Sequence, residues 1–284
     1  MTISGRKVIA CVPFGRERYV RVLLPYLLQE PVDEVRLWLN TDEPADLAYA
    51  TGLVPTVALV RAGGELNKSL YPAKELGFPG STEHFQYNDS VCRFYPGCVE
   101  PNTVYIKCDD DICYFHPGAI RALVEEVIEH RDENYAVLAN VFNVPHTTLL
   151  HQKSGSLDKE PMSTGDPRCP VSCTDGPFAE QIHRQFLGAH KEGTLDKFVL
   201  PSHNVYGRAR IGVMAWTGEN FAKFGGQVGP ADEKELTQRI PQLLGMRLRL
   251  AGNALCSHYA FSHQRGHLDT TDILKQYEVL TRRS

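Results

Sequence analysis

The first half of the chain alternates short apolar, β-branched runs with longer stretches whose apolar residues recur at helical spacing. One such run covers residues 7–12 and ends at the Pro-Phe-Gly sequence of residues 13–15, and helical spacing follows over residues 18–29. The pattern predicts a strand, a loop and a helix. A second apolar run over residues 34–39 ends in the polar sequence Asn-Thr-Asp at residues 40–42. These elements form a βαβ unit, whose parallel strands bring their carboxyl ends to one edge of a sheet.

The same alternation continues through the rest of this half. It predicts strands over residues 56–60, 104–107 and 135–141 and helices over residues 81–95 and 118–130. Pro117 precedes the second of these helices, where its fixed φ and missing N–H suit the first turn. Regular alternation of strands and helices predicts an α/β fold with a mostly parallel central sheet flanked by helices.

Periodicity is weaker in the second half of the chain. Residues 151–177 hold Lys, Ser, Gly, Asp and Pro with little periodicity, which predicts a long surface loop of the kind that forms lids or binds acceptors. Apolar spacing predicts the remaining elements: helices over residues 178–189 and 232–244, a strand over residues 211–216 and a closing amphipathic helix over residues 272–283. The closing helix has a basic end. The helix would either pack on the core or touch an anionic membrane.

Composition narrows the class of protein. The 284 residues are 42% apolar, enough for a full core, and carry a formal net charge of -4 with both signs interspersed. A chain with this charge balance lacks the positive electrostatic field that attracts nucleic acid, so we do not expect a nucleic-acid-binding protein. The short polar start is unlike a secretory signal, and no apolar window reaches the ~18 residues that span a bilayer. We therefore expect a cytoplasmic protein, with peripheral membrane contact left open, and the oligomeric state is not indicated.

The chemistry is expected at Asp109, Asp110 and Asp111, three adjacent carboxylates that close the apolar run of residues 104–107. Adjacent carboxylates near a packed strand are costly unless a cation or hydrogen bonds compensate them, and a divalent metal ion is the simplest compensator. In an extended segment Asp109 and Asp111 would share one face and Asp110 would point to the other. Two carboxylates would then converge on one hard cation or its phosphate-bound ligand. The alternative interpretation is a solvated acidic turn.

These pieces together resemble the GT-A fold glycosyltransferases. The strongest element is the sequence Val-Tyr-Ile-Lys-Cys-Asp-Asp-Asp-Ile of residues 104–112, which matches the D-x-D signature of nucleotide-sugar-dependent transferases. The strand and loop Val-Ile-Ala-Cys-Val-Pro-Phe-Gly-Arg of residues 8–16 and the polar strand end at residues 40–42 add to it. The resemblance covers residues 7–265 and implies a Rossmann-like, GT-A type sheet.

The resemblance also implies the domain organisation and the metal. We expect one GT-A domain over residues 1–284, with a nucleotide-sugar-binding half over 1–145 and an acceptor-binding half over 146–284. In this family the last acid of the motif holds a divalent metal, Mn²⁺ or Mg²⁺, that bridges the diphosphate. Carried over, the metal ligands are Asp111, with Asp109 as second contributor, and the late His258, while Asp110 is the ribose or sugar contact. His263 is the alternative histidine and would otherwise face a phosphate.

The donor implied by the resemblance is a nucleotide sugar, a UDP- or GDP-sugar. In this family the nucleotide base and ribose usually rest against the loop after the first strand, so Arg16 is singled out among the basic residues of this half. A dication and basic side chains stabilise the negative charge that develops on the leaving phosphate. Besides Asp109 and Asp110, the residues predicted to bind the donor are Pro13, Phe14, Arg16, Asn40, Thr41, Arg93 and Lys107.

The family also uses a carboxylate beyond the D-x-D motif to deprotonate the acceptor hydroxyl. Asp232 and Glu233 follow an aromatic and glycine-rich segment over residues 216–231 and fall in the first turn of a predicted helix, which turns the positive end of its dipole toward them. Asp232 is the predicted general base and Glu233 the alternate. The competing interpretation is helix capping, because Glu235 lies three positions after Asp232.

The sequence thus predicts a metal-dependent glycosyltransferase. It would transfer a sugar from a nucleotide sugar to a hydroxyl of a saccharide or lipid-linked acceptor, with inversion, in surface polysaccharide or glycoconjugate assembly. A sugar nucleotidyltransferase shares the architecture but has a glycine-rich, basic loop after its first strand, and the loop of residues 13–18 is poor in glycine. A metal-dependent phosphohydrolase generally has further His or Asp pairs early in the chain. A non-catalytic nucleotide-sugar-binding module would keep the fold alone.

Overall fold

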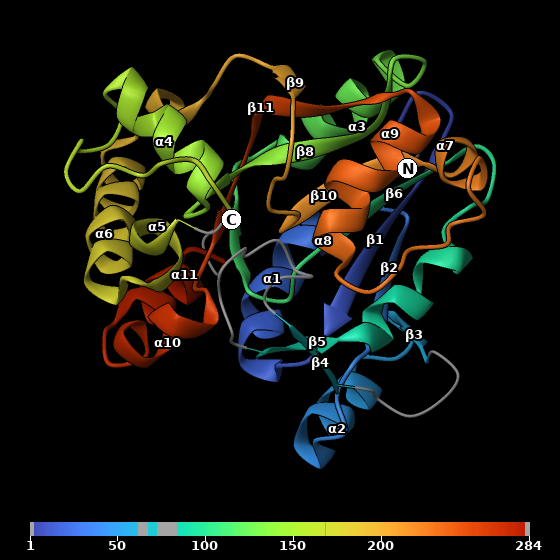
Figure 1. Ribbon diagram of the computed structural model, residues 1–284. Helices are drawn as coiled ribbons and strands as arrows, with labels where there is room; N and C mark the ends of the chain where they lie inside the picture. The colour runs from blue at the N-terminus through green and yellow to red at the C-terminus, as the bar shows by residue number, and fades with distance from the viewer. Residues whose placement is uncertain (1–2, 62–67, 73–83, 168, 282–284) are drawn as a thin grey trace.

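The computed structural model in Figure 1 describes residues 3–61, 68–72, 84–167 and 169–281. Within these residues a central sheet has nine strands in the order β3-β2-β1-β6-β10-β8-β11-β7, and β9 pairs with β11. Its strands are β1 Lys7–Phe14, β2 Glu34–Leu39, β3 Ala58–Val60, β6 Thr103–Cys108, β7 Ile112–Phe115, β8 Asn134–Phe142, β9 His203–Val205, β10 Val213–Thr217 and β11 Arg247–His258. Strands β4 Lys68–Pro72 and β5 His84–Asn88 form a separate antiparallel pair.

The sheet is mostly parallel. Strands β3, β2, β1, β6, β8 and β11 run in one direction, while β10, β7 and β9 run in the other. The predicted fold class, an α/β fold with a mostly parallel central sheet flanked by helices, is confirmed. The sheet also draws strands from both halves of the chain, since β9, β10 and β11 come from the second half.

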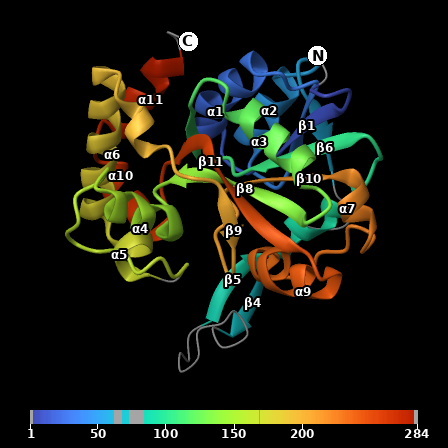
Figure 2. The ribbon, with the colours of Figure 1, turned by 90° about the horizontal axis from the view of Figure 1, so that it is seen from above.

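Helices lie on both faces of the sheet and gather beside the end of the sheet that β11 and β7 form. They are α1 Glu17–Gln29, α2 Pro44–Gly52, α3 Ala119–Glu129, α4 Pro145–Ser154, α5 Pro170–Thr174, α6 Gly176–Glu192, α7 Gly218–Ala222, α8 Asp232–Lys234, α9 Ile240–Leu244, α10 Ser262–Leu268 and α11 Ile273–Thr281. In both ribbon views α4, α5, α6, α10 and α11 form one group at the side of the sheet (Figures 1 and 2). In the described residues no helix is long and apolar enough to cross a membrane.

The core consists of two apolar layers, one on each face of the sheet. Strand β1 contributes to both layers: Val8, Ala10 and Val12 pack into one, and Ile9 and Cys11 pack into the other. The reason is that successive side chains of a strand point to opposite faces of the sheet. The first layer holds the buried faces of α1, α3, α6 and α11, and the second holds an aromatic group around Trp38 and Trp216. Each fully buried large apolar side chain contributes roughly 1.5–3 kcal/mol to folding.

Most predicted elements of the first half lie within a few residues of the observed ones, but the helix predicted over residues 81–95 is wrong. Its described part is the strand β5 followed by two short 3₁₀ turns, Asp89–Arg93 and Tyr95–Gly97. In residues 84–88 aromatic and polar residues alternate, which is the period of a strand rather than of a helix. Helix α2 was not predicted.

The long surface loop predicted over residues 151–177 is also wrong at both ends. Helix α4 begins at Pro145 and continues to Ser154 before Gly155, whose φ of 80° ends it, and α5 begins at Pro170. The segment between them is tied to the buried side chain of Gln152. Its amide donates to the carbonyls of Asp158 and Pro161 at 3.0 and 2.9 Å, so hydrogen bonds rather than periodicity fix this segment.

Candidate active site

A pocket of about 900 Å³ opens at one edge of the sheet. The parallel strands β1, β2, β6, β8 and β11 end there, and the antiparallel strand β10 begins there, so loops from distant parts of the chain meet. Eleven predicted site residues line it: Pro13, Arg16, Asn40, Thr41, Lys107, Asp109, Asp110, Asp111, Asp232, Glu233 and His258. Two others do not, since Phe14 is fully buried against Tyr49 and the exposed Arg93 lies outside the lining.

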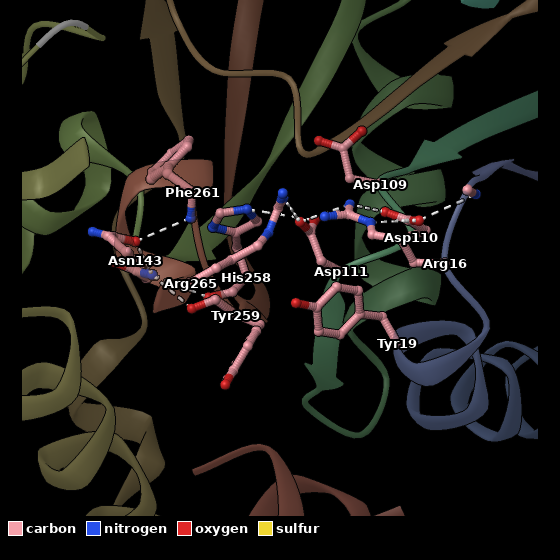
Figure 3. A network of polar contacts seen from close by, with 12 residues as sticks. Arg16, Tyr19, Asp109, Asp110, Asp111, Asn143, His258, Tyr259, Phe261 and Arg265 are labelled. Carbon is pink, nitrogen blue, oxygen red and sulfur yellow. Dashed lines mark hydrogen bonds and ion pairs between the residues drawn. The ribbon is translucent and has the colours of Figure 1, made fainter. Parts of the chain in front are cut away.

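The three aspartates lie in a tight turn between β6 and β7. The amide of Ile112 donates to the carbonyl of Asp109 at 3.2 Å, and the amide of Tyr259 donates to the carbonyl of Asp111 at 2.9 Å. The extended conformation predicted for this segment is therefore wrong. In the turn Asp110 and Asp111 are both buried and share the guanidinium of Arg16, while Asp109 is turned away from them (Figure 3).

Asp110 joins the turn to the loop after β1. Its carboxylate accepts hydrogen bonds from Arg16, through Nε at 3.0 Å and through Nη2, and from the amide of Gly15 at 3.2 Å. Burial and the adjacent Asp111 raise the pKa of Asp110 to about 6, against the lowering effect of Arg16. In this arrangement the side chain holds the two loops together.

Asp111 lies at the centre of a cationic cluster. Its Oδ2 accepts hydrogen bonds from Arg16 Nη2 at 3.0 Å and from Arg265 Nη2 at 2.9 Å, and its Oδ1 lies 3.4 Å from His258 Nε2 (Figure 3). Burial opposes the charged carboxylate, but His258 and the two guanidiniums outweigh it, so the pKa of Asp111 lies well below its usual range. Asp111 is thus an anion at any ordinary pH.

Asp109 belongs to a different group of charges. It forms an ion pair with Lys107, whose buried ammonium also donates to the carbonyl of Ile211 at 2.9 Å. Burial disfavours the charged lysine, but the carboxylates of Asp109 and Asp232 outweigh burial and raise the pKa of Lys107. The carboxylate of Asp109 is more than a third exposed and does not converge with that of Asp111.

His258 ends strand β11 and is held by the residue that follows β8. Asn143 adopts the left-handed conformation with φ of 62°, and its Nδ2 lies 3.0 Å from the carbonyl of Tyr259 and 3.4 Å from that of His258. Phe261 covers the imidazole with a ring separation of 4.6 Å. His263, the alternative histidine, is exposed on α10 and outside the pocket lining.

The two candidate bases are in different environments. Asp232 Oδ2 accepts a hydrogen bond from the Tyr95 hydroxyl at 3.0 Å, and burial raises the pKa of Asp232. Glu233 is held by two arginines, with Arg208 Nε 2.7 Å from Oε1 and Arg210 Nη1 2.9 Å from Oε2. Both oxygens of Glu233 are therefore engaged by guanidiniums, whereas in the described part of the chain no arginine is hydrogen-bonded to the carboxylate of Asp232.

The capping box considered for this segment is not formed. The residue before α8 is Ala231, and its side chain makes no cap. Asp232 Oδ1 accepts from the amide of Glu233 at 2.8 Å, while Glu235 Oε2 accepts from the amide of Gly229 at 3.3 Å. The helix start therefore leaves Asp232 facing the pocket.

Three residues of this site were missed in the sequence. Arg265 and Tyr95 contact Asp111 and Asp232 across 154 and 137 positions, and Arg210 lines the pocket beside Glu233. The only signals were basic residues near other candidates, Arg265 shortly after His258 and an Arg-Ala-Arg sequence at residues 208–210. Neither signal indicates which residue the arginine contacts until the fold is known.

The fit of a divalent metal can be tested against these side chains. In the described part of the chain no group of three or more His, Cys, Asp or Glu residues is placed to hold a metal ion. Asp111 Oδ1 and His258 Nε2 nevertheless lie 3.4 Å apart, so these two side chains offer a buried oxygen and nitrogen at one point. The pocket lining includes seven carboxylates against four Lys and Arg side chains. Such a lining suits a cation, so the pair fits a two-residue site completed by ligand oxygens.

Comparisons with known proteins find similarity in structure only. No protein-family model and no curated protein matches the sequence. Among solved structures, a mycobacterial protein matches over 98% of this chain and 75% of its own, with 12% identity and a TM-score of 0.45. Glucosyl-3-phosphoglycerate synthase from Mycobacterium tuberculosis, in complex with Mn²⁺, UDP and phosphoglyceric acid, matches over 68% of this chain and 67% of its own, with 15% identity and a TM-score of 0.33.

A third structure, 4-diphosphocytidyl-2C-methyl-D-erythritol synthase, matches over 46% of this chain and 58% of its own, with 16% identity and a TM-score of 0.32. All three TM-scores lie below 0.5. None of these likenesses therefore indicates a function for this chain.

Proposed function

We propose that this protein is a metal-dependent glycosyltransferase. It transfers a sugar from a nucleotide sugar to a hydroxyl of a saccharide or lipid-linked acceptor, with inversion, in surface polysaccharide or glycoconjugate assembly. One observation carries the proposal: the buried pair Asp111 and His258 and the carboxylate of Asp232 line the same pocket at the carboxyl edge of the sheet. This juxtaposition supports a cation site and a base in one cavity.

The donor half of the pocket is formed by the loops after β1 and β2. Pro13, Asn40 and Thr41 line it, and we assign the nucleotide to this end. Asp111 and His258 would hold the metal ion. When bound, Mn²⁺ or Mg²⁺ supplies positive charge to the diphosphate oxygens. Because acidic residues outnumber basic ones in the lining, the diphosphate binds poorly without that added charge.

The acceptor half supplies the base. The acceptor oxygen attacks the anomeric carbon, the bond from that carbon to the phosphate oxygen breaks, and the hydroxyl proton passes to Asp232. Its raised pKa suits it to take up a proton, and the hydrogen bond from Tyr95 fixes its orientation. The nucleoside diphosphate leaves with the bonding electrons. A carboxylate placed for direct deprotonation suits displacement with inversion.

Calorimetric titration with UDP, GDP, CDP and dTDP, each with Mn²⁺ and then with chelator, tests the proposal. Asp111→Asn removes the buried anion, and Asp272→Asn is the matched control, because Asp272 pairs with Arg184 on the surface. We expect one nucleotide to bind in a metal-dependent manner to the native chain and the control, and to lose most of its affinity in Asp111→Asn. Binding that Asp111→Asn leaves unchanged, or binding of none of the four, would contradict the proposal.

A second measurement separates the enzyme classes. With the nucleotide identified, its sugar conjugates are incubated with the chain and the products are resolved. Release of nucleoside diphosphate with transfer of the sugar to a saccharide supports a glycosyltransferase. Formation of pyrophosphate from a nucleoside triphosphate and a sugar phosphate would indicate a nucleotidyltransferase, and release of inorganic phosphate alone would indicate a phosphohydrolase.

A further inference from the structure

Two arginines neutralise Asp111, but they are held very differently. Arg16 makes hydrogen bonds to both oxygens of Asp110 and to Asp111, and its guanidinium lies over the ring of Tyr19 at 4.8 Å. Within the described residues the guanidinium of Arg265 makes a single hydrogen bond, from Nη2 to Asp111. Its Nε is buried without a hydrogen-bond partner among the described residues. A guanidinium has five donors, so Arg265 leaves most of its capacity unused.

The position of Arg265 explains what could use this capacity. The side chain belongs to α10, lines the pocket and reaches Asp111 from the side opposite Arg16 (Figure 3). Oδ2 of Asp111 already accepts from both guanidiniums and Oδ1 faces His258. A dication held by Asp111 and His258 would add two positive charges beside these guanidiniums, which favours the release of one of them. Arg265 is the partner that leaves at the cost of one hydrogen bond, whereas the release of Arg16 would also strip Asp110.

We propose that Arg265 is a diphosphate-binding residue that neutralises Asp111 in the ligand-free chain and passes its guanidinium to the donor's diphosphate when a metal ion binds Asp111. This inference rests on the proposed function. Arginine is suited to bind the diphosphate because its planar guanidinium binds two phosphate oxygens at once. The exchange keeps every charge compensated: Asp111 gains the metal ion, and the guanidinium gains an anion.

The exchange makes the binding of metal and diphosphate cooperative. Without the diphosphate, a metal ion at Asp111 releases a half-buried guanidinium that then loses its anionic partner, so metal alone binds weakly. With the diphosphate present the displaced guanidinium has a new partner, and each ligand raises the affinity for the other by the same factor. The rigid placement of Arg16 means that Arg265 carries this coupling.

Titration of the full chain with Mn²⁺, alone and with the nucleoside diphosphate that binds the native protein, tests the inference. In Arg265→Gln we expect Mn²⁺ alone to bind more tightly, by about tenfold, because its competitor is gone. The nucleotide at saturating Mn²⁺ should bind about tenfold more weakly, and the mutual enhancement should disappear. Arg265→Lys keeps a competing charge but loses the fork, so Mn²⁺ alone should bind as weakly as in the native chain.

Arg184→Gln is the control for loss of one positive charge, since Arg184 pairs with Glu180 and Asp272 on the surface. Thermal unfolding of each variant shows that it is folded. If the nucleotide binds and Arg265→Gln leaves both affinities unchanged, or weakens Mn²⁺ binding in its absence, the inference is wrong while the proposed function stands. If the native chain binds no nucleoside diphosphate, the proposed function itself fails.

Discussion

Tyr95 donates its hydroxyl hydrogen bond to Asp232 Oδ2 at 3.0 Å and thereby connects the aromatic core to the acceptor side of the pocket. The ring of Tyr95 is fully buried and packs beside Trp38, Trp216 and Phe221 with ring separations of 5.3, 6.0 and 6.3 Å. The phenol is therefore fixed by packing before it meets the carboxylate. This bond holds the candidate base in one orientation, which is the condition for efficient proton transfer.

Removing only the hydroxyl, in Tyr95→Phe, should change the pH dependence of transfer. The hydrogen bond lowers the pKa of Asp232 against the larger effect of burial, which raises it. Without the bond the pKa of Asp232 rises further, so the base becomes protonated at a higher pH and the acid limb of kcat/KM moves upward. The ring stays in the aromatic cluster, so stability should fall by only about 1 kcal/mol. An unmoved acid limb in profiles of kcat/KM against pH would contradict this role.

Two isosteric substitutions should separate the candidate bases. Asp232→Asn removes the carboxylate that accepts from Tyr95 and should lower kcat by a factor on the order of 10²–10⁴ with a small effect on stability. Glu233→Gln leaves Arg208 and Arg210 without their anion and should lower the free energy of unfolding by about 3 kcal/mol. Single-turnover transfer and chemical denaturation of both variants measure the two effects. The reverse pattern would make Glu233 the base.

The fold and the general place of the site could be predicted because both depend on local patterns. Apolar spacing located β1, α1 and β2 within two residues of their observed bounds, and parallel strands bring their carboxyl ends together. Polar residues directly after predicted strands, such as Arg16, Asn40 and Asp111, were therefore expected at one edge, and they line the pocket there.

The detailed contacts could not be predicted because they depend on the turn that follows β6. An extended segment would have paired Asp109 with Asp111, but the turn pairs Asp110 with Asp111 instead. Once the backbone turns, side-chain alternation no longer applies. Arg265 approaches from 154 positions away, and no pattern in one sequence fixes that approach.

The course of β11, which ends at His258, should depend on Gly252. The pairing of β11 with β8 shifts register between Ala251 and Leu255, and a Cβ at Gly252 would lie 1.7 Å from the carbonyl oxygen of Leu200. Gly252→Ala must therefore displace backbone, and we expect it to lower the free energy of unfolding by about 3 kcal/mol or to prevent folding. Gly188→Ala is the matched control, because nothing lies within 4 Å of its added Cβ in α6. That variant should gain up to about 1 kcal/mol in chemical denaturation.

Stability should fall in acid because His151 is buried as a neutral ring. Neither ring nitrogen has a hydrogen-bond partner among the described residues, and burial between Phe142 and Phe198 lowers the pKa of His151 to about 3. The unfolded chain has the ordinary pKa of about 6.5, so between these values it binds more protons than the folded chain and stability decreases as pH falls. This single group contributes about 1.4 kcal/mol per pH unit over that range. His151→Leu should remove that share of the slope in denaturation curves at pH 4 to 7, whereas His263→Gln, at an exposed position, should keep it. Equal slopes in His151→Leu and the native chain would show that the buried imidazole is not what destabilises the protein in acid.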